Sequence, residues 1–349
     1  MRSFTRASTL DPVPGDIVSL LRRIDMAAGA EARHVDQVPQ LLRALQEQAR
    51  IESVTASSAI EGVHVADVRV PNLLSGNPQR IRNRSEAEFA GYSAALGYLN
   101  QQDPGELTVG LVLHLHRLLF SFGDGRGGHF KVEDNLVVDR HPDGSARTRF
   151  APVGWRETPF YMDELGERTN AALRYNETHP LLVVAAFVLD LLCIHPFADG
   201  NGRVARLATT HLLRRSGYGV GKYVSVEQLI YETKDEYYQA LEASTTGWFD
   251  DGRHTAWPWA DYLLGRLDAA YTRFGTRVAA GTGGGTKQDR VRDFTLLHAP
   301  TPFTIADVRR AVPGISDNTI RLVLSELRNE GLIANDGTGR SASWHRVGA

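Results

Sequence analysis

The sequence lacks the features that mark secreted and membrane-spanning proteins. It has a single cysteine, Cys193, so no disulfide can form within the chain and we expect a reducing, cytoplasmic setting. The opening stretch MRSFTRASTLDPVPGD has no apolar core of the kind that a secretory signal needs. The longest apolar stretch, Leu181–Ile194, contains Asp190 and is shorter than a membrane span of about 20 residues. We therefore expect a protein that does not bind membranes.

No charge of one sign dominates the chain. The 39 Lys and Arg residues nearly balance the 41 Asp and Glu residues, so the composition gives no general signal for binding polyanions. A hydrophobic fraction of 42% and a charged fraction of 23% are near globular averages, which excludes general disorder, collagen and coiled coils. At roughly 150 residues per domain, the length suggests two or three domains.

The spacing of apolar residues predicts a mainly α fold. Residues 1–35 are mixed and poorly periodic, but from Val38 the apolar positions follow a helical pattern that Gly62 would end. Gly-rich turns around Asn135–Asp139 and a tight HPDGS turn predict a small β-hairpin, or flap, between residues 123 and 152. Further helices are predicted over residues 86–99, 107–122, 157–176, 180–194, 203–215, 226–244 and 257–273.

The C-terminal part begins after a glycine run, AGTGGGTK at residues 280–287, which predicts a linker. A helix over residues 290–298 and helices capped by Thr304 and Ser316 then precede two short strands, an order that resembles a winged helix-turn-helix. Residues 286–349 carry nine basic and seven acidic side chains, a weak footprint for phosphates, so DNA binding and protein docking both stay open. The predicted domains are an N-terminal helical region, a catalytic domain, a linker and a winged helix domain, at residues 1–80, 81–275, 276–288 and 289–349.

The loop HPFADGNGRVAR, at residues 195–206, carries the chemistry. Two glycines around an asparagine, Gly200–Gly202, let successive backbone N–H groups turn inward as an anion-binding nest at a helix N-terminus. Arg203 and Arg206 are three residues apart, so they emerge on neighbouring parts of one helical face. Together these features predict a cradle for a polyphosphate.

Two other side chains of the loop can act on a bound nucleotide. His195 stands where an imidazole could take a proton from an incoming nucleophile. Asp199 is the only carboxylate of the loop, and one carboxylate with phosphate oxygens is a common way to hold Mg²⁺. A lone histidine after a buried helix, or a DGNG turn alone, is usually structural. Their combination with the nest and the paired arginines favours a functional site.

This loop resembles the signature of the Fic (filamentation induced by cAMP) family, His-x-Phe-x-(Asp/Glu)-Gly-Asn-Gly-(Arg/Lys)-x-x-Arg, at every specified position. The resemblance implies a Fic-type helical domain with a β-hairpin flap, joined here to a C-terminal winged helix. Lys131 departs from the arginine expected at its position. Other Fic-like segments, which spread the resemblance over most of the chain, are Gly128–Lys131, Phe150–Pro152, Ser225, the Tyr237–Tyr238 pair, Leu241, Trp248 and Trp257.

The resemblance implies an enzyme, a protein adenylyltransferase that moves AMP from ATP to a Tyr, Thr or Ser hydroxyl of a protein. By position, the general base would be His195, the Mg²⁺ ligand Asp199, and the nucleotide-binding residues Gly200, Asn201, Gly202, Arg203 and Arg206. Phosphorylating members of the family carry a bulkier residue in place of Gly202, so the glycine favours the usual triphosphate pose.

A second motif, SSAIEG at residues 57–62, is similar to the Fic inhibitory motif (Ser/Thr)-x-x-x-Glu-(Gly/Asn). Ser57 and Glu61 are four residues apart, on one helical face, and Gly62 completes the motif. The resemblance implies that Glu61 pairs with Arg206 and restrains the enzyme. A helix end with an exposed glutamate is the plain alternative. In some relatives the equivalent glutamate supports removal of AMP, and the sequence does not separate the two roles.

Several features leave alternatives open. Tyr237 and Tyr238 could flank the adenine, or they could pack as part of an ordinary amphipathic helix. His114 and His116 lie on different sides of a helix, so packing is favoured over metal binding. The target protein, self-modification, homodimer formation and the choice of ATP over another nucleotide all stay open. The competing class is a DNA-linked regulator with a nucleotide-sensing loop, but a sensor would not require the base His195.

Overall fold

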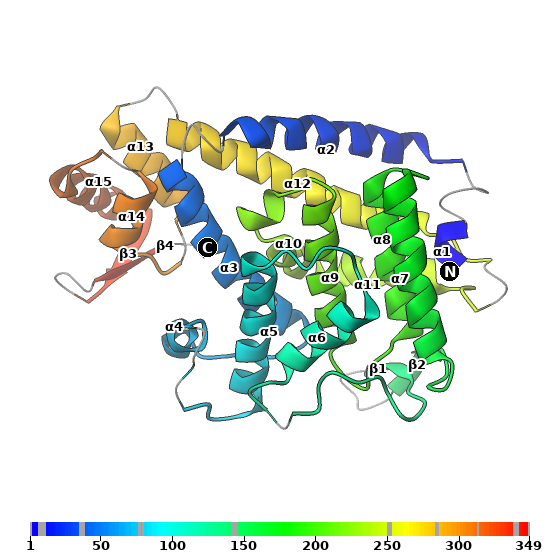
Figure 1. Cartoon of the computed structure of the whole chain (residues 1–349). Helices are drawn as coiled ribbons and strands as arrows, with labels where there is room; N and C mark the ends of the chain where they lie inside the picture. Colours follow the sequence, from blue (N-terminus) through cyan, green and yellow to red (C-terminus); the bar gives the residue numbers. More distant parts are fainter. Residues whose placement is uncertain are drawn as a thin grey trace. The chain divides into compact units, whose positions relative to one another are not determined.

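The computed structural model describes residues 2–5, 12–34, 39–75, 78, 80–123, 125–140, 146–249, 253–282, 286–299, 301–312, 314–337 and 342–347. This part of the chain is mainly α-helical, with two small antiparallel hairpins, β1–β2 and β3–β4 (Figure 1). The first half contains α1 (Arg2–Thr5), α2 (Gly15–His34), α3 (Pro39–Ile60), η2 (Asp67–Arg69), α4 (Val70–Leu73), α5 (Arg84–Gln101), α6 (Val109–Leu119), β1 (Val137–Arg140), β2 (Ala146–Phe150) and α7 (Thr158–Tyr175). The second half contains α8 (Pro180–Ile194), α9 (Asn201–Arg215), η3 (Val220–Lys222), α10 (Val226–Glu232), α11 (Lys234–Thr245), α12 (Trp257–Thr282), α13 (Lys287–Asp293), η4 (Phe294–His298), α14 (Ile305–Ala311), α15 (Asp317–Asn329), β3 (Ile333–Asp336) and β4 (Ser343–Arg346).

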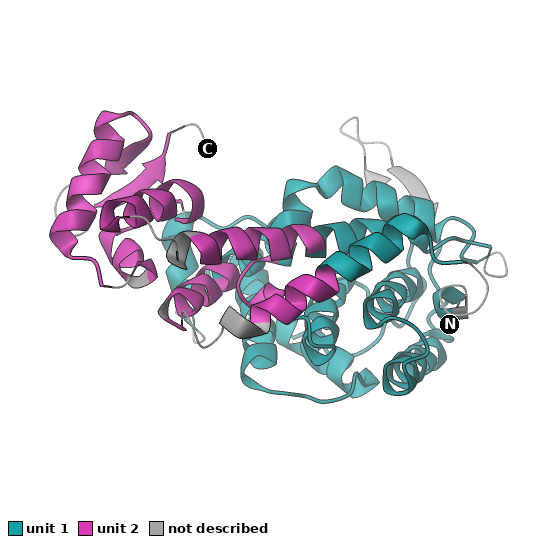
Figure 2. Ribbon diagram, turned by 90° about the horizontal axis from the view of Figure 1, so that it is seen from above, with its two compact units in different colours: residues 1–23, 51–218, 226–267 teal, residues 24–50, 219–225, 268–349 magenta. Residues whose placement is uncertain are grey.

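The chain divides into two compact units, which Figure 2 shows in different colours. Unit 1 is formed by residues 1–23, 51–218 and 226–267, and unit 2 by residues 24–50, 219–225 and 268–349. Helices α2, α3 and α12 each contribute to both units. The units interleave along the chain, whereas the predicted domains follow the chain in order; those domain boundaries stay a prediction.

Helix α8 forms the centre of unit 1. Every residue from Leu181 to Ile194 is buried, because the helix is apolar on all sides and must be covered by other elements. Helices α7 and α9 both pack against it, and Figure 1 shows α7 and α8 side by side. The predicted helix over residues 180–194 agrees with α8, and the flap agrees with the hairpin β1–β2. The HPDGS turn lies outside the described residues.

Helix α2 corrects the description of residues 1–35 as poorly periodic. Ile17, Leu20, Leu21 and Ile24 are buried, and their spacing is that of one helical face. The exposed Val18, on the other side of the helix, obscures the stripe in the sequence. The predicted helix over residues 226–244 is also wrong in detail, because the chain forms α10 and α11 with a break at Thr233.

Helices α5 and α6 approach each other closely at Gly91. A methyl group there would lie 1.9 Å from the backbone oxygen of Leu119, whereas nothing lies within 4 Å of one at Gly97 in the same helix. Gly91→Ala should therefore lower the free energy of unfolding by about 3 kcal/mol, at the upper end for overpacking, because backbone cannot yield as a side chain can. Gly97→Ala should raise it by up to about 1 kcal/mol through helix propensity. Urea unfolding of both variants checks this pair, and equal effects would contradict it.

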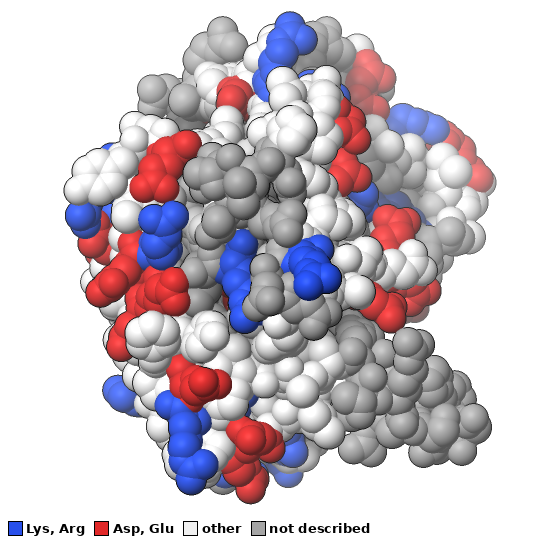
Figure 3. All heavy atoms as spheres, turned by 90° about the vertical axis from the view of Figure 1, so that its right-hand side faces the viewer, with Lys and Arg blue, Asp and Glu red and all other residues white. Residues whose placement is uncertain are grey.

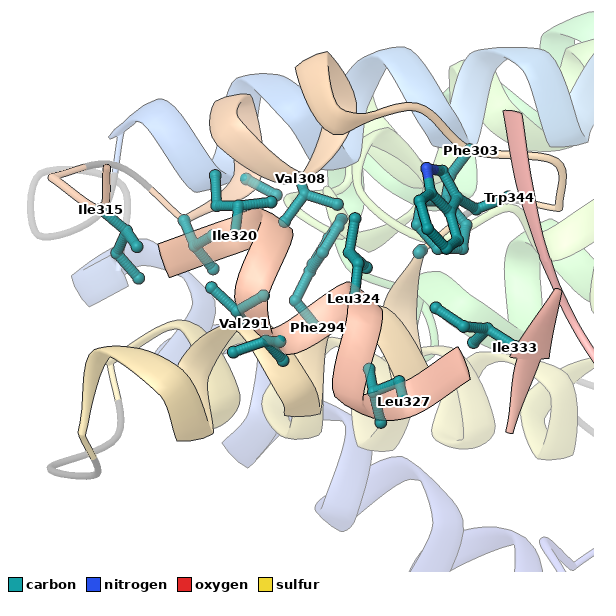
Figure 4. Close-up of a cluster of buried hydrophobic side chains, with 14 residues drawn as sticks. Val291, Phe294, Phe303, Val308, Ile315, Ile320, Leu324, Leu327, Ile333 and Trp344 are labelled. Atoms are coloured by element: carbon teal, nitrogen blue, oxygen red, sulfur yellow. The ribbon is translucent and has the colours of Figure 1, made fainter. Parts of the chain in front are cut away.

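The C-terminal part of unit 2 has its own apolar core (Figure 4). Thr304 and Ser316 accept hydrogen bonds from the first turns of α14 and α15, as predicted. The order of three helices and a hairpin is the one expected for a winged helix, an assignment that stays a prediction. Helix α12 continues to Thr282, beyond its predicted end, because Phe274 and Val278 extend its buried face. The core consists of Val291, Phe294, Ala299, Phe303, Val308, Ala311, Val312, Ile315, Ile320, Val323, Leu324, Leu327, Ile333 and Trp344.

Charges of both signs are mixed on the face of the molecule seen in Figure 3, where blue and red side chains alternate over the described residues. No helix within the described ranges combines the length and the apolar character that crossing a membrane requires.

Candidate functional site

The loop between α8 and α9 contains two residues with a left-handed backbone, His195 and Gly200. Helix α8 ends at Ile194, and the next residue, His195, adopts a left-handed conformation with φ 51° and ψ 61°. Gly200 precedes α9 with φ 84°, a conformation that glycine adopts without strain. Helix α9 then begins at Asn201, two residues earlier than predicted. The predicted nest residues therefore lie at the N-terminus of a helix, where unpaired N–H groups favour an anion.

Asn201 closes the loop on itself. Its Oδ1 accepts a hydrogen bond from the backbone N–H of Phe197 over 2.9 Å, and its Nδ2 donates to the carbonyl oxygen of Phe197 over 2.8 Å. Both residues are buried. The asparagine thus fixes both polar backbone groups of Phe197, so its role includes loop geometry as well as the predicted anion hole.

His116, which the sequence interpretation assigned to packing, also holds the loop. Its ring stacks on Phe197 with 3.8 Å between the ring centroids. Its Nδ1 accepts from the N–H of Gly128 over 3.0 Å, so its Nε2 carries the proton and donates to the Asp199 carbonyl oxygen at 3.1 Å. Burial lowers the pKa of His116 to about 4, which keeps the ring neutral. His114 instead packs edge-to-face against Tyr98.

Lys131 and Asn135 support the loop from the segment before the flap. The backbone N–H of Lys131 donates to the Pro196 carbonyl oxygen over 2.9 Å, and its Nζ donates to Asn135 over 2.9 Å. Asn135 in turn donates to the carbonyl oxygen of Phe197 over 3.1 Å. Burial lowers the pKa of Lys131 to about 8. The lysine at this position is therefore built into the loop scaffold.

His195 is poised as a neutral imidazole. Its Nδ1 lies 3.3 Å from the carbonyl oxygen of Leu192, which can only accept, so Nδ1 is the protonated nitrogen and Nε2 is the basic one. Burial lowers the pKa of His195 to about 4, and the positive charge of Lys131 acts in the same direction. The ring of Phe150, at the end of the flap strand β2, meets the imidazole edge-to-face. A neutral Nε2 can accept a proton from a hydroxyl group.

The side chain of Arg206, on helix α9, contacts the end of helix α3. Its Nε donates to Ser57 Oγ over 2.8 Å, and its Nη2 donates to Glu61 Oε1 over 2.7 Å and to the Ser57 carbonyl oxygen over 3.1 Å. Although burial opposes the charge, the carboxylate of Glu61 raises the pKa of Arg206. The structure thus brings together the three predicted residues of the restraint.

Arg203 is held by an acidic residue that the sequence interpretation missed. Its Nη1 donates to Glu88 Oε2 over 2.6 Å, and its Nη2 lies 3.2 Å from Asp199 Oδ1. Both Arg203 and Glu88 are buried. The sequence holds a signal for this pair, because Glu88 stands among apolar residues of α5 and a buried carboxylate needs a cationic partner.

The site has buried donors without acceptors. Arg203 Nε and Arg206 Nη1 are buried and have no hydrogen-bond partner among the described residues. A methyl group at Gly202 would lie 2.4 Å from Glu61 Oε1 and 3.2 Å from Arg206 Nη1, so the glycine lets both groups approach the loop. Unpaired guanidinium donors beside a helix N-terminus fit a ligand that is rich in anionic oxygens, such as a nucleotide triphosphate.

Asp199 can hold Mg²⁺ only if a bound nucleotide supplies further ligands. Its side chain is 48% exposed and is the one carboxylate of the loop. Within the described ranges, no three His, Cys, Asp or Glu side chains gather as a metal site. A Mg²⁺ ion bound here would therefore take its other ligands from phosphates and water, as Mg²⁺ commonly does in nucleotide sites.

The two tyrosines that could flank adenine differ in exposure. Tyr237 is buried and packs edge-to-face on Trp259 and Tyr262, with centroids 5.7 and 5.9 Å away. Tyr238 is half-buried, with Lys234 Nζ 6.0 Å from its ring centroid. The ring of Tyr237 thus belongs to the core, and Tyr238 offers the more accessible face. Contact of either ring with adenine stays a prediction.

Comparisons with known proteins identify the class. Residues 106–213, which include helix α8, the loop and most of helix α9, match the Fic/DOC family. A crystal structure of a Fic family protein from Desulfovibrio desulfuricans has a TM-score of 0.62 at 21% identity and covers 97% of this chain and 98% of its own. Fic-1 from C. elegans has a TM-score of 0.57 at 22% identity, over 76% of this chain and 73% of its own. The chain therefore has the fold of these Fic proteins, and its residues 106–213 are similar to the Fic/DOC family.

The curated relatives of the chain are named for an activity. The chain is 27% identical over 213 residues to "Protein adenylyltransferase Fic" of Drosophila mojavensis, a match that covers 58% of this chain and 40% of the relative. The protein of the same name from Drosophila ananassae is 31% identical over 134 residues, which cover 38% of this chain and 25% of the relative. The chain thus spans less than half the length of these relatives.

Proposed function

We propose that the protein is an adenylyltransferase that moves AMP from ATP to the hydroxyl of a Tyr, Thr or Ser side chain of a protein, itself included. The observation that carries the proposal is a pair of buried guanidinium donors, Arg203 Nε and Arg206 Nη1, beside the N-terminus of α9; neither has a hydrogen-bond partner in the part of the chain that the structure describes. They are suited to the charge of a triphosphate, and the relatives named adenylyltransferase support the reaction class.

In the proposed reaction, each group of the loop has one task. His195 Nε2 takes the proton of the attacking hydroxyl, because Nδ1 is engaged with Leu192. The hydroxyl oxygen forms a bond to the α-phosphorus while the bond from that phosphorus to pyrophosphate breaks, and pyrophosphate leaves. The N–H groups at the start of α9, with Arg203 and Arg206, bind the phosphate oxygens and stabilise the charge that develops on them. Asp199 would hold Mg²⁺, which would neutralise negative charge on the phosphates when bound.

We propose that the protein is at rest in the conformation described. Glu61 accepts a hydrogen bond from Nη2 of Arg206. Its carboxylate lies next to Gly202, where it would repel a triphosphate. The restraint is a local electrostatic contact between α3 and α9, so a change that withdraws α3 would release it. A role of Glu61 in removing AMP from a modified protein is the second candidate function, since its carboxylate lies inside the site.

The competing class, a DNA-linked regulator, receives less support. Two arginines of the C-terminal part already pair with carboxylates: Arg292 with Glu330, and Arg309 with Asp317. Paired cations contribute little to phosphate binding, and the net charge of this part is already small. Docking to a protein is therefore the more favoured use of a winged helix here.

Two ATP labels test the activity. Purified protein carrying Glu61→Gly, incubated with Mg²⁺ and ATP, should acquire label from α-labelled ATP and none from γ-labelled ATP. Label from the γ-phosphate alone would replace the proposal by kinase activity. Absence of any nucleotide binding in calorimetry would contradict the nucleotide site itself.

The pH dependence of transfer tests the state of His195. A base must be unprotonated, and the pKa of His195 is lowered to about 4. In the Glu61→Gly variant, kcat/KM should therefore stay nearly constant from about pH 8 down to pH 5 and fall as the pH approaches 4. An imidazole with its ordinary pKa of 6.5 would already lose most of its activity by about pH 5.5. That earlier loss in the pH–rate profile would contradict the assignment of a buried, neutral base.

A further inference from the structure

Helix α5 contributes two charged residues, Arg84 and Glu88, that reach the loop. Arg84 Nη2 donates to Asp199 Oδ2 over 2.8 Å, while the other carboxylate oxygen of Asp199 faces Arg203 Nη2 at 3.2 Å. Glu88 accepts from Arg203 with one oxygen and from Arg84 Nε with the other. The four side chains form an alternating chain of charges in which both oxygens of Asp199 face guanidinium groups.

The two arginines of this chain differ in how firmly they are held. The side chain of Arg203 is 3% exposed and that of Glu88 9% exposed, so separating them would leave charges without water. The side chain of Arg84 is 73% exposed, and water can replace its hydrogen bonds at little cost. If a group must leave Asp199, Arg84 is therefore the one that leaves.

We propose that Arg84 is a resting counterion of Asp199 that a divalent cation displaces when it binds with the nucleotide. The inference rests on the proposed function, in which Asp199 is the metal ligand. A cation bound at Asp199 Oδ2 would lie beside the guanidinium of Arg84, and the two positive charges repel each other, so binding of the cation favours the departure of Arg84. Asp199 is the only carboxylate of the loop, so the loop offers the cation no alternative carboxylate.

Glu88 has a complementary positioning role in this proposal. Its Oε2 keeps Arg203 directed toward the loop, and its Oε1 gives Arg84 a partner that does not depend on Asp199. Arg84 can therefore leave Asp199 while its positive charge stays paired with Glu88. The metal site is thus closed at rest by a contact separate from the Glu61–Arg206 pair.

Metal affinity tests the proposal without relying on catalysis. In the Glu61→Gly background, Mn²⁺ binding is titrated by electron paramagnetic resonance in the presence of a non-hydrolysable ATP analogue. Arg84→Ala should lower the Kd for Mn²⁺ by about two- to fivefold, the range for losing one exposed ion pair. Arg82→Ala is the matched control. Arg82 is an exposed arginine two residues before Arg84, so the variant removes the same charge, and it should change the Kd for Mn²⁺ less.

The possible outcomes separate this proposal from the proposed function. Equal Mn²⁺ affinity in Arg84→Ala and Arg82→Ala, or weaker binding in Arg84→Ala, overturns the counterion role. Failure of the Glu61→Gly parent to bind the ATP analogue with Mn²⁺ overturns the proposed function instead. Thermal unfolding of all three proteins ensures that the comparison is between folded molecules, and Arg84→Lys, which keeps the charge, should retain the affinity of the parent.

Discussion

Replacing Glu61 with glycine is expected to raise the rate of AMP transfer on the order of ten- to a hundredfold, the range of a coupling free energy of about 1–3 kcal/mol. The carboxylate of Glu61 lies 2.7 Å from Nη2 of Arg206, so its removal frees a donor in the phosphate cradle. It also removes a negative charge beside Gly202, where the triphosphate would bind. Incorporation of label from α-labelled ATP, measured for wild type and variant side by side, checks the effect.

Two control variants test whether a higher rate in Glu61→Gly comes from the lost Glu61–Arg206 contact or from a weakened helix α3. Thr55→Gly places a glycine at an exposed position of the same helix and should leave the rate of transfer unchanged. Glu61→Gly combined with Arg206→Ala should lose most of the gain, because the freed arginine is the group that binds phosphate. Equal labelling of wild type and Glu61→Gly would contradict the restraint.

The same variants address the second role considered for Glu61. A labelled target incubated with wild-type protein loses its AMP only if the carboxylate supports hydrolysis. Loss of label with wild type but not with Glu61→Gly would favour removal of AMP, whereas stable label in both would leave Glu61 as a restraint alone.

The predicted loop residues come together because they are neighbours in the chain. Residues 195–206 bring their own geometry, since a helix end, a turn with Gly200 and a second helix leave little freedom for the backbone. The approach of Glu61 to Arg206 is different, since 145 residues separate them and no local pattern encodes the contact. It could be anticipated only through resemblance to a known motif, and its effect on activity stays a prediction.

The sequence does not predict which residues the supporting side chains contact. Glu88 lies 115 positions from Arg203, and His116 lies 83 positions from Asp199, so their contacts depend on how α5, α6 and α9 pack. A histidine on an apolar helix is usually a packing residue, and only its two hydrogen bonds show that His116 joins Gly128 to the loop. Tertiary packing decides such roles, whereas periodicity decides helices such as α8.

His195→Ala, made in the Glu61→Gly background, is expected to lower the rate of AMP transfer by about 10²- to 10⁴-fold, the usual contribution of a general base. Nucleotide affinity should stay within about twofold, because the imidazole faces the acceptor hydroxyl in the proposed reaction and the phosphates bind to α9 and its arginines. Calorimetry with an ATP analogue and labelling with α-labelled ATP measure the two quantities separately.

A histidine outside the loop provides the matched control for this loss. His64 is exposed, and its replacement by alanine should leave both nucleotide affinity and transfer unchanged. If His195→Ala still incorporated label at the rate of its Glu61→Gly parent, proton removal by His195 would be excluded. His195 has a left-handed backbone with φ 51°, which histidine adopts more readily than alanine, so affinity and unfolding temperature must be measured beside the rate. A lower rate with unchanged affinity and unchanged unfolding temperature therefore reflects the lost imidazole and not a displaced loop.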